Sequence, residues 1–186
     1  LPYPRGMGQA GIRAIAVAVW ALVALVAVVA AGLPLYVFPA DDHVARADVI
    51  VVLGPATPAR VAVAQRLLDE GVAPRMLISV PPEGTYAAAN IPACREARVS
   101  CVSPRPATTK GEALMLDEDG ARSAVVVTFS PQVARARFIF DKCHDGPVSV
   151  VGADDRLSLV QWAYQYAYQS AAFAKAWVLP CAGATR

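Results

Sequence analysis

The segment Asp48-Val-Ile-Val-Val-Leu-Gly54 gives the first indication of the architecture of this chain. Its central residues are all apolar and mostly β-branched, without polar alternation, which is typical of a short strand buried on both faces of a parallel sheet. Beyond Gly54, Pro58 can occupy the first turn of a helix. Gly71 and Pro74 then end that helix before the next apolar run.

The same alternation of strand and helix continues along the chain. We predict further strands over 76–80, 99–102, 123–128 and 148–151, and helices over 58–71, 86–90, 109–119, 131–142 and 157–179. Repeated strand–helix units with short connections predict an α/β domain in which about five parallel strands carry helices on both faces. Ligands of such sheets bind beyond the carboxyl ends of the strands. Here that edge would carry Gly54 and the segments 79–83, 104–112 and 128–132.

Residues 14–38 contain no charged side chain and consist mainly of Ala, Val and Leu. As a helix this stretch would reach about 37 Å, enough to cross a hydrocarbon core of roughly 30 Å. We therefore predict a single transmembrane helix. A cleaved signal peptide has the same order of basic start, apolar run and small residues, but its apolar core is usually shorter. A retained anchor is the favoured interpretation.

The charges on either side of this helix predict its orientation. Arg5 and Arg13 precede it, whereas Asp41 and Asp42 follow it. Positive charge before the helix favours a cytoplasmic N-terminus. We expect a cytoplasmic segment, a helix in the bacterial inner membrane and an extracytoplasmic α/β domain, over residues 1–13, 14–38 and 39–186.

The chain has four cysteines and two histidines, His43 and His144. No two cysteines form a C-x-x-C pair, and we expect His144 at the surface, so no metal site is predicted. An even number of cysteines outside the membrane predicts disulfides. Three pairings are open, and four reduced, buried cysteines are the alternative. We favour the pairs Cys94–Cys101 and Cys143–Cys181.

Several segments in order carry a family resemblance. They are Asp48–Gly54, Arg60, Gly71-Val-Ala-Pro74, Leu77-Ile-Ser79 and Val127-Thr-Phe-Ser-Pro-Gln-Val-Ala-Arg-Ala136. Together they resemble the YdcF/SanA/ElyC-like family over most of residues 47–151. The resemblance implies a Rossmann-like domain behind an N-terminal membrane anchor. It also implies a role in envelope integrity or in cell-wall precursor and lipid-carrier metabolism, with a nucleotide-like ligand in some members.

The chain departs from the family pattern where chemistry would be expected. The family's Ser-x-x-His-x-x-Arg-Ala reads Phe129-Ser-Pro-Gln132-Val-Ala-Arg135-Ala136, and its Ser-x-Asn-Thr-x-Glu-Asn is reduced to residues 108–112, where Glu112 matches the glutamate. Glutamine does not titrate, so Gln132 removes the proton carrier that a histidine would supply near neutral pH. We therefore name no catalytic residue and no cofactor.

Ligand binding can survive this loss. The helix that follows Ser130, with that hydroxyl as its cap, would point free N–H groups at an anion. Arg60 and Arg135 would add charge-assisted hydrogen bonds to a phosphate, and Glu112 would accept from a hydroxyl or hold an arginine. The candidate ligand-binding residues are Gly54, Arg60, Glu112, Thr128, Ser130 and Arg135. Each has a plainer interpretation: a strand break at Gly54, a helix cap at Ser130, a first-turn acid at Glu112 and a solvated surface residue at Arg135.

The last predicted helix is rich in aromatic residues and glutamine. It carries Trp162, Tyr164, Tyr166, Tyr168, Phe173 and Trp177, interleaved with Gln161, Gln165 and Gln169. So many rings cannot all face one stripe, so we expect some at the surface. Exposed aromatic residues beside amides suit a membrane interface or a protein partner, whereas the others would pack in the core.

Two functions follow from these features. The first is a non-catalytic accessory subunit of a larger bacterial membrane complex, respiratory or envelope-related, bound through the transmembrane helix and the helix over 157–179. The second is an envelope protein that binds or processes a phosphate-bearing ligand at the carboxyl edge of the sheet. The net charge of +2 comes from scattered charges of both signs and gives no indication of nucleic-acid binding.

Overall fold

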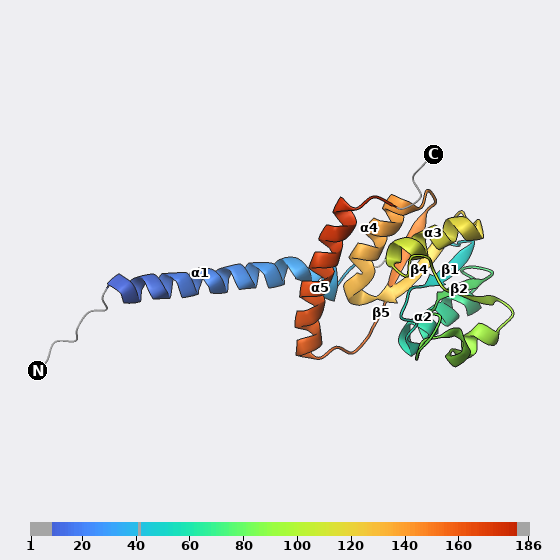
Figure 1. Cartoon of the computed structure of the whole chain (residues 1–186), viewed down its shortest axis with the longest axis horizontal. Helices are drawn as coiled ribbons and strands as arrows, with labels where there is room; N and C mark the ends of the chain where they lie inside the picture. The colour runs from blue at the N-terminus through green and yellow to red at the C-terminus, as the bar shows by residue number, and fades with distance from the viewer. Residues whose placement is uncertain (1–8, 41, 182–186) are drawn as a thin grey trace, which may run out of the picture.

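A computed structural model describes residues 9–40 and 42–181 and shows a Rossmann-like α/β domain behind a long N-terminal helix (Figure 1). The five strands are β1 (Val49–Val52), β2 (Met76–Ser79), β3 (Val99–Val102), β4 (Ala124–Phe129) and β5 (Val148–Ala153). All pairs are parallel, and the order is β3-β2-β1-β4-β5. The predicted fold class is confirmed.

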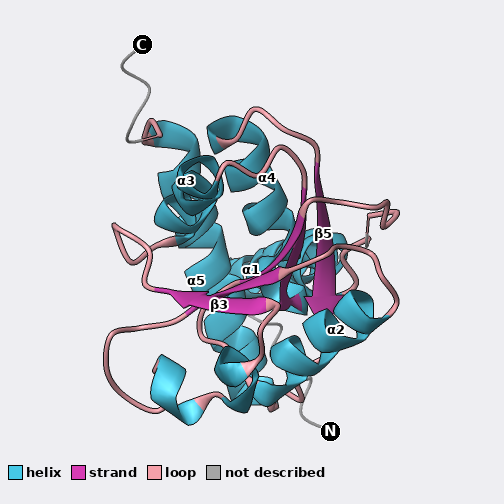
Figure 2. Ribbon diagram, turned by 90° about the vertical axis from the view of Figure 1, so that its right-hand side faces the viewer, coloured by secondary structure: helices cyan, strands magenta, loops and turns pink. Residues whose placement is uncertain are grey.

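Helices cover both faces of this sheet (Figure 2). Helix α2 (Pro58–Asp69) packs on one face, whereas α3 (Thr109–Asp119) and α4 (Val133–Cys143) pack on the other. Successive side chains of the central strand β1 point to opposite faces of the sheet and so belong to two hydrophobic cores. Val49 and Val51 pack in the core with α3 and α4, and Ile50 and Val52 pack in the core with α2. This explains why the run is apolar at every position.

Helix α5 (Leu159–Val178) forms an outer layer on α4. The stacked rings of Phe138 and Phe173, with centroids 5.1 Å apart, lie between the two helices. The segment between β2 and β3 contains two short 3₁₀ turns, η2 (Ala88–Asn90) and η3 (Pro92–Arg95). The first of them takes the place of the short helix predicted over 86–90.

Side-chain caps are found at the starts of α2 and α3 but not at Ser130. Thr57 caps α2 and Thr108 caps α3, each accepting from a backbone N–H of the first turn. Ser130 was expected to cap α4, and this is wrong. It opens a 3₁₀ turn, η4 (Ser130–Gln132), and its hydroxyl donates toward Ala153 O and Asp154 Oδ1, at 3.5 and 3.4 Å.

The N-terminal helix α1 (Gln9–Gly32) continues as a π-helical turn, η1 (Leu33–Val37). Together they form the one helix in the described part of the chain that is long and apolar enough to cross a membrane. Its most apolar stretch has a mean hydropathy of 2.8 and is not buried against the domain. The helix begins earlier than the predicted residue 14 and includes Arg13.

Helix α5 lies across the end of α1 rather than alongside it (Figure 1). The Tyr166 hydroxyl donates to Val29 O at 3.2 Å, and the Tyr36 and Ser170 hydroxyls are 2.9 Å apart. The rings of Tyr36 and Tyr166 meet edge to face. A Cβ atom at Gly32 would overlap the Tyr166 ring, so glycine is needed for this crossing.

The four cysteines lie at disulfide-bonding distance in the two favoured pairs. The Cα atoms of Cys94 and Cys101 are 5.7 Å apart, and those of Cys143 and Cys181 are 5.6 Å apart. The first pair closes a loop between β2 and β3. The second ties the segment after α5 to the end of α4, across a sequence separation of 38 residues.

The two pairs should differ in their contribution to stability. Loop-closure entropy predicts a loss of about 4 kcal/mol when Cys143 and Cys181 are both replaced by alanine, and of about 2 kcal/mol for the Cys94 and Cys101 pair. The measurement is urea unfolding of the full chain in detergent micelles. Equal losses, or a larger loss for the shorter loop, would contradict this account.

Candidate functional site

The strand order reverses between β1 and β4, which makes their carboxyl ends the expected ligand site of the sheet. Gly54 follows β1 directly, and Arg60 stands in the first turn of α2 beside it. Glu112 reaches this place from the first turn of α3, and Arg135 from α4. The structure therefore brings four of the six candidate residues together.

Glu112 lies at the centre of this group and is only 5% exposed. Its Oε1 accepts a hydrogen bond from the Gly54 N–H at 2.7 Å. Burial raises the pKa of Glu112, whereas hydrogen bonds from Ser79 and Gly54 and the charges of Arg60 and Arg135 act in the opposite direction. The carboxyl group is thus hydrogen-bonded to the ends of β1 and β2 and interacts with the charges of both arginines.

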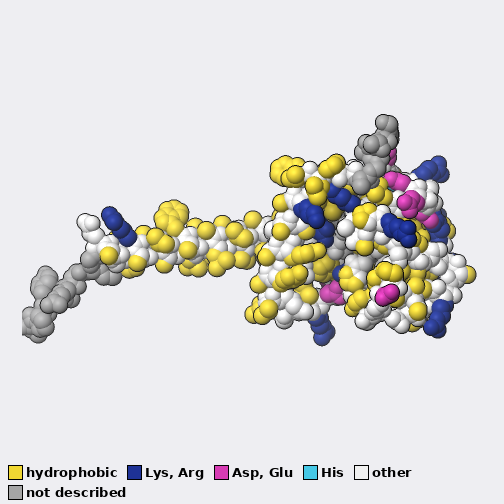
Figure 3. Space-filling model, in the orientation of Figure 1, with side chains coloured by type: hydrophobic (Ala, Val, Ile, Leu, Met, Phe, Trp, Pro, Cys, Tyr) yellow, Lys and Arg dark blue, Asp and Glu magenta, His cyan; other side chains and the backbone are white. Residues whose placement is uncertain are grey.

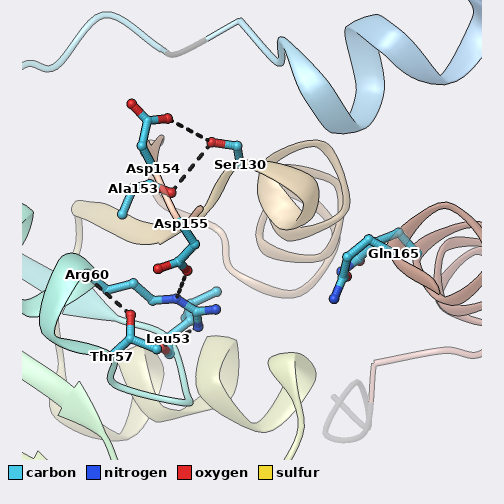
Figure 4. A network of polar contacts seen from close by, with 9 residues as sticks. Leu53, Thr57, Arg60, Ser130, Ala153, Asp154, Asp155 and Gln165 are labelled. Atoms are coloured by element: carbon cyan, nitrogen blue, oxygen red, sulfur yellow. Dashed lines mark hydrogen bonds and ion pairs between the residues drawn. The ribbon is translucent and has the colours of Figure 1, made fainter. Parts of the chain in front are cut away.

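Arg60 lies beside Glu112 and is 3% exposed. Its Nη1 donates to Leu53 O at 3.2 Å, and its Nε lies 3.9 Å from Asp155 Oδ2 (Figure 4). The guanidinium also stacks over the Phe129 ring, 4.6 Å from its centroid. Burial lowers the pKa of Arg60, and the charges of Asp155 and Glu112 partly offset this.

Arg135 is buried between three helices, so its plainer interpretation as a solvated surface residue is wrong. Its Nε donates to Gln169 Oε1 of α5 at 2.8 Å, and its Nη1 to Thr109 Oγ1 of α3 at 3.4 Å. Gln132 Nε2 donates to the same Thr109 oxygen at 3.2 Å. Burial lowers the pKa of Arg135, opposed by Tyr168 and Glu112. The group links α3, α4 and α5.

The other two candidates do not join this cluster. Thr128 is fully buried within β4, and its hydroxyl has no hydrogen-bond partner. Ser130 is half-buried and bonds to the end of β5 (Figure 4). It lines a shallow hollow with Gly152, Asp154 and the segment 37–39 that follows α1. The Thr128 hydroxyl has no neighbouring base, and the hydrogen bond from Ser130 to the Asp154 carboxylate, at 3.4 Å, is long.

The carboxyl edge of the sheet is filled by side chains of the chain itself. Arg60, Glu112, Gln132 and Arg135 are each less than a tenth exposed and are bonded to neighbouring groups. A second hollow, lined by Asp117, Arg122 and His144, lies away from this edge. Among the described residues, no group of three or more His, Cys, Asp or Glu side chains is placed to hold a metal ion.

Several residues of the cluster were not identified from the sequence. Gln169, Asp155 and Thr109 all contact its arginines. The four-residue spacing of Gln161, Gln165 and Gln169 was a usable signal, because it predicts one polar stripe on the last helix. Asp155 follows β5 in a loop and carries no such signal.

The prediction of a surface position for His144 is wrong. The side chain is 7% exposed, and its Nδ1 lies 2.8 Å from Asp117 Oδ1. Gly146 lets the following loop fold closely over the ring, because a Cβ there would overlap the Arg122 carbonyl. The sequence gives no sign of this close approach.

No family model, no curated protein and no solved structure matches this chain. Its function has to be inferred from its own residues and their geometry.

The raised pKa of Glu112 predicts a pH-dependent stability. The folded state keeps the Glu112 proton to a higher pH than the unfolded state, whose pKa is near the ordinary value of 4.5. Above that value, therefore, the contribution of Glu112 to the free energy of unfolding falls as pH rises toward the folded pKa. The Glu112→Gln variant keeps an acceptor for Gly54 but cannot lose a proton, so its stability relative to the parent should increase with pH.

The measurement is urea unfolding in micelles at a series of pH values from about 4 to 8. Glu118→Gln, an exposed change on the same helix, is the matched control and should follow the parent. Parallel curves for Glu112→Gln and the parent would show that burial does not govern this carboxyl group.

Proposed function

We propose that this chain is a membrane-anchored, non-catalytic accessory subunit of a larger bacterial membrane complex. The observation that carries the proposal is the filled carboxyl edge: Arg60, Glu112, Gln132 and Arg135 are buried there, and each is hydrogen-bonded to a neighbouring group of the chain. Gln132, at the position of the family histidine, is itself used as a donor to Thr109. The remaining acid, Glu112, is held by Gly54 and Ser79. This arrangement favours a structural role for the edge.

The same proposal places the α/β domain outside the bacterial inner membrane. The two cysteine pairs support this location, because disulfides persist in oxidising compartments. Arg13 at the start of α1 and Asp42 after it support an N-terminus on the cytoplasmic side. The YdcF/SanA-like resemblance agrees with such an anchored domain.

The partner would bind to α1 within the bilayer. The domain leaves the apolar stretch of this helix uncovered, so its sides are open to the helices of other subunits. Small residues such as Ala18, Ala21 and Ala24 allow close approach of another helix.

Purification from native membranes in a mild detergent tests this role. The full chain should migrate with a reproducible set of membrane proteins on native gels. A variant in which residues 14–31 are all leucine keeps the anchor but changes its surface, and should be released from that set. A parent protein that migrates as a free monomer would overturn the accessory role, and retention of the variant would overturn binding through α1.

The second candidate function, binding of a phosphate-bearing ligand, is favoured by one observation. Two buried guanidiniums, Arg60 and Arg135, flank one buried carboxyl group, and Arg60 Nε has no hydrogen-bond partner. A surplus of buried cationic donors is what a phosphate requires.

Titration of inorganic phosphate and of a nucleoside diphosphate into the micellar full chain separates the two candidates. The accessory role predicts no heat of binding for either. The ligand-binding function would instead be established by saturable binding whose affinity falls at least tenfold in Arg60→Gln but not in the exposed control Arg98→Gln.

A further inference from the structure

Helix α5 packs on the protein with a mixed side, on which Trp162, Phe173 and Ala176 lie beside two glutamines, and leaves large apolar side chains on its outer side. Gln169 is fully buried and Gln165 half-buried, both directed toward α4 and Arg135. Leu159, Val160 and Val178 are instead 80% exposed or more. A surface helix in water normally carries charged and polar residues on its outer side, which this helix largely lacks. The outer side of α5 is therefore built for surroundings other than water.

The outer side of α5 also carries few charged residues. No charged residue occurs between Arg156 and Lys175. The exposed side chains of this helix are mainly alanines, Leu159 and Val160, with the polar residues Gln161 and Ser170 among them. Tyr164 is 61% and Tyr168 48% exposed, and their rings are stacked; Trp177 follows Lys175 and is 74% exposed. Figure 3 shows hydrophobic side chains along α1 and again on the side of the domain where α5 lies. Tyr and Trp at such a boundary are typical of the membrane–water interface.

The position of α5 along α1 matches the edge of a bilayer. From Arg13 to Gly32, helix α1 rises by about 28 Å, close to the thickness of a hydrocarbon core. Tyr166 touches α1 at Gly32 and Val29, at the end of that span. Because α5 crosses the end of α1 (Figure 1), it runs along the membrane plane at the level where α1 leaves the bilayer.

From these observations we infer that α5 is a membrane-surface helix, with its apolar outer side in the interfacial layer of the same leaflet from which α1 emerges. The occupant of this side is lipid, and the basic residues Arg156 and Lys175 lie near its two ends, where they can meet headgroup phosphates. The inference depends on α1 crossing the membrane but not on the accessory role. It assigns the aromatic helix to lipid rather than to a protein partner.

Tryptophan quenching in vesicles tests this placement with the full chain. The chain has three tryptophans, Trp20 in α1 and Trp162 and Trp177 in α5. In a Trp20→Phe, Trp162→Phe background, Trp177 alone reports on the outer side of α5. Phosphatidylcholine brominated near the headgroup should quench its emission at least twofold relative to unbrominated lipid.

Two single-tryptophan controls make the outcome specific. Trp162→Phe with Trp177→Phe leaves Trp20, and quenching by deeply brominated lipid then checks the span of α1 independently. Tyr86→Trp, in a background without the three native tryptophans, reports on the loop after β2 and should not be quenched. If Trp20 is quenched but Trp177 is quenched no more than this control, the inference is wrong although the span is correct.

A charge placed on the outer side should lift α5 from the bilayer. Ala167 and Ala171 are exposed in the middle of the helix, and the double change to aspartate should at least halve the quenching of Trp177. Ala89→Asp, exposed in η2, is the control and should leave it unchanged. Circular dichroism verifies that each variant stays folded. Unchanged quenching in a folded Ala167→Asp, Ala171→Asp variant would overturn the inference.

Discussion

A guanidinium that is removed from water must find acceptors inside the protein, and Arg135 finds its closest one on α5, at Gln169. Together with the stacked rings of Phe138 and Phe173, this hydrogen bond helps to set the rotation of α5 about its own axis. Gln165 and Gln169 turn inward together with Phe173 and Ala176, while Leu159, Val160, Tyr164 and Tyr168 turn outward. The same placement of α5 covers Arg135 and leaves these outer side chains exposed.

The switch point of this sheet is occupied by the protein's own charges. In open α/β sheets the carboxyl ends of the strands usually form a crevice for a ligand. Here Arg60, Glu112 and Arg135 occupy it, and each is largely removed from water. Removing one member of such a group leaves a buried charge without compensation, which is why these networks are sensitive to single changes. Phe129 completes the closure by stacking under Arg60.

Local patterns in the sequence predicted most of the fold. The apolar run at 49–53, the Pro and Gly punctuation and the spacing of the cysteines predicted the parallel sheet, the helix boundaries and the two cysteine pairs. These features depend on neighbours in the chain. The grouping of Gly54 with Glu112 was also predicted, because both belong to the carboxyl edge of the sheet.

What the sequence missed depends on contacts between distant residues. Ser130 precedes a proline, which predicts a helix cap. Strand β5, however, extends to Ala153, and the Ser130 hydroxyl donates to the Ala153 carbonyl group instead. Arg135 reads as a surface residue until α5 covers it, and the position of α5 depends on α1 as well as on α4. Residue types and spacing within the α/β domain do not show that α1 also contacts α5.

The C-terminal end of α5 is held as firmly as its middle. Lys110 and Lys142 donate to the carbonyl groups of Leu179 and its neighbours, which suits the negative end of a helix dipole, and Cys181 follows at bonding distance from Cys143. In the arrangement inferred above, with α1 through the bilayer and α5 flat on its surface, the head has two non-parallel supports. In that arrangement, swinging and rolling of the head about α1 are restrained, and a neighbour in the membrane would meet it at one height and one orientation.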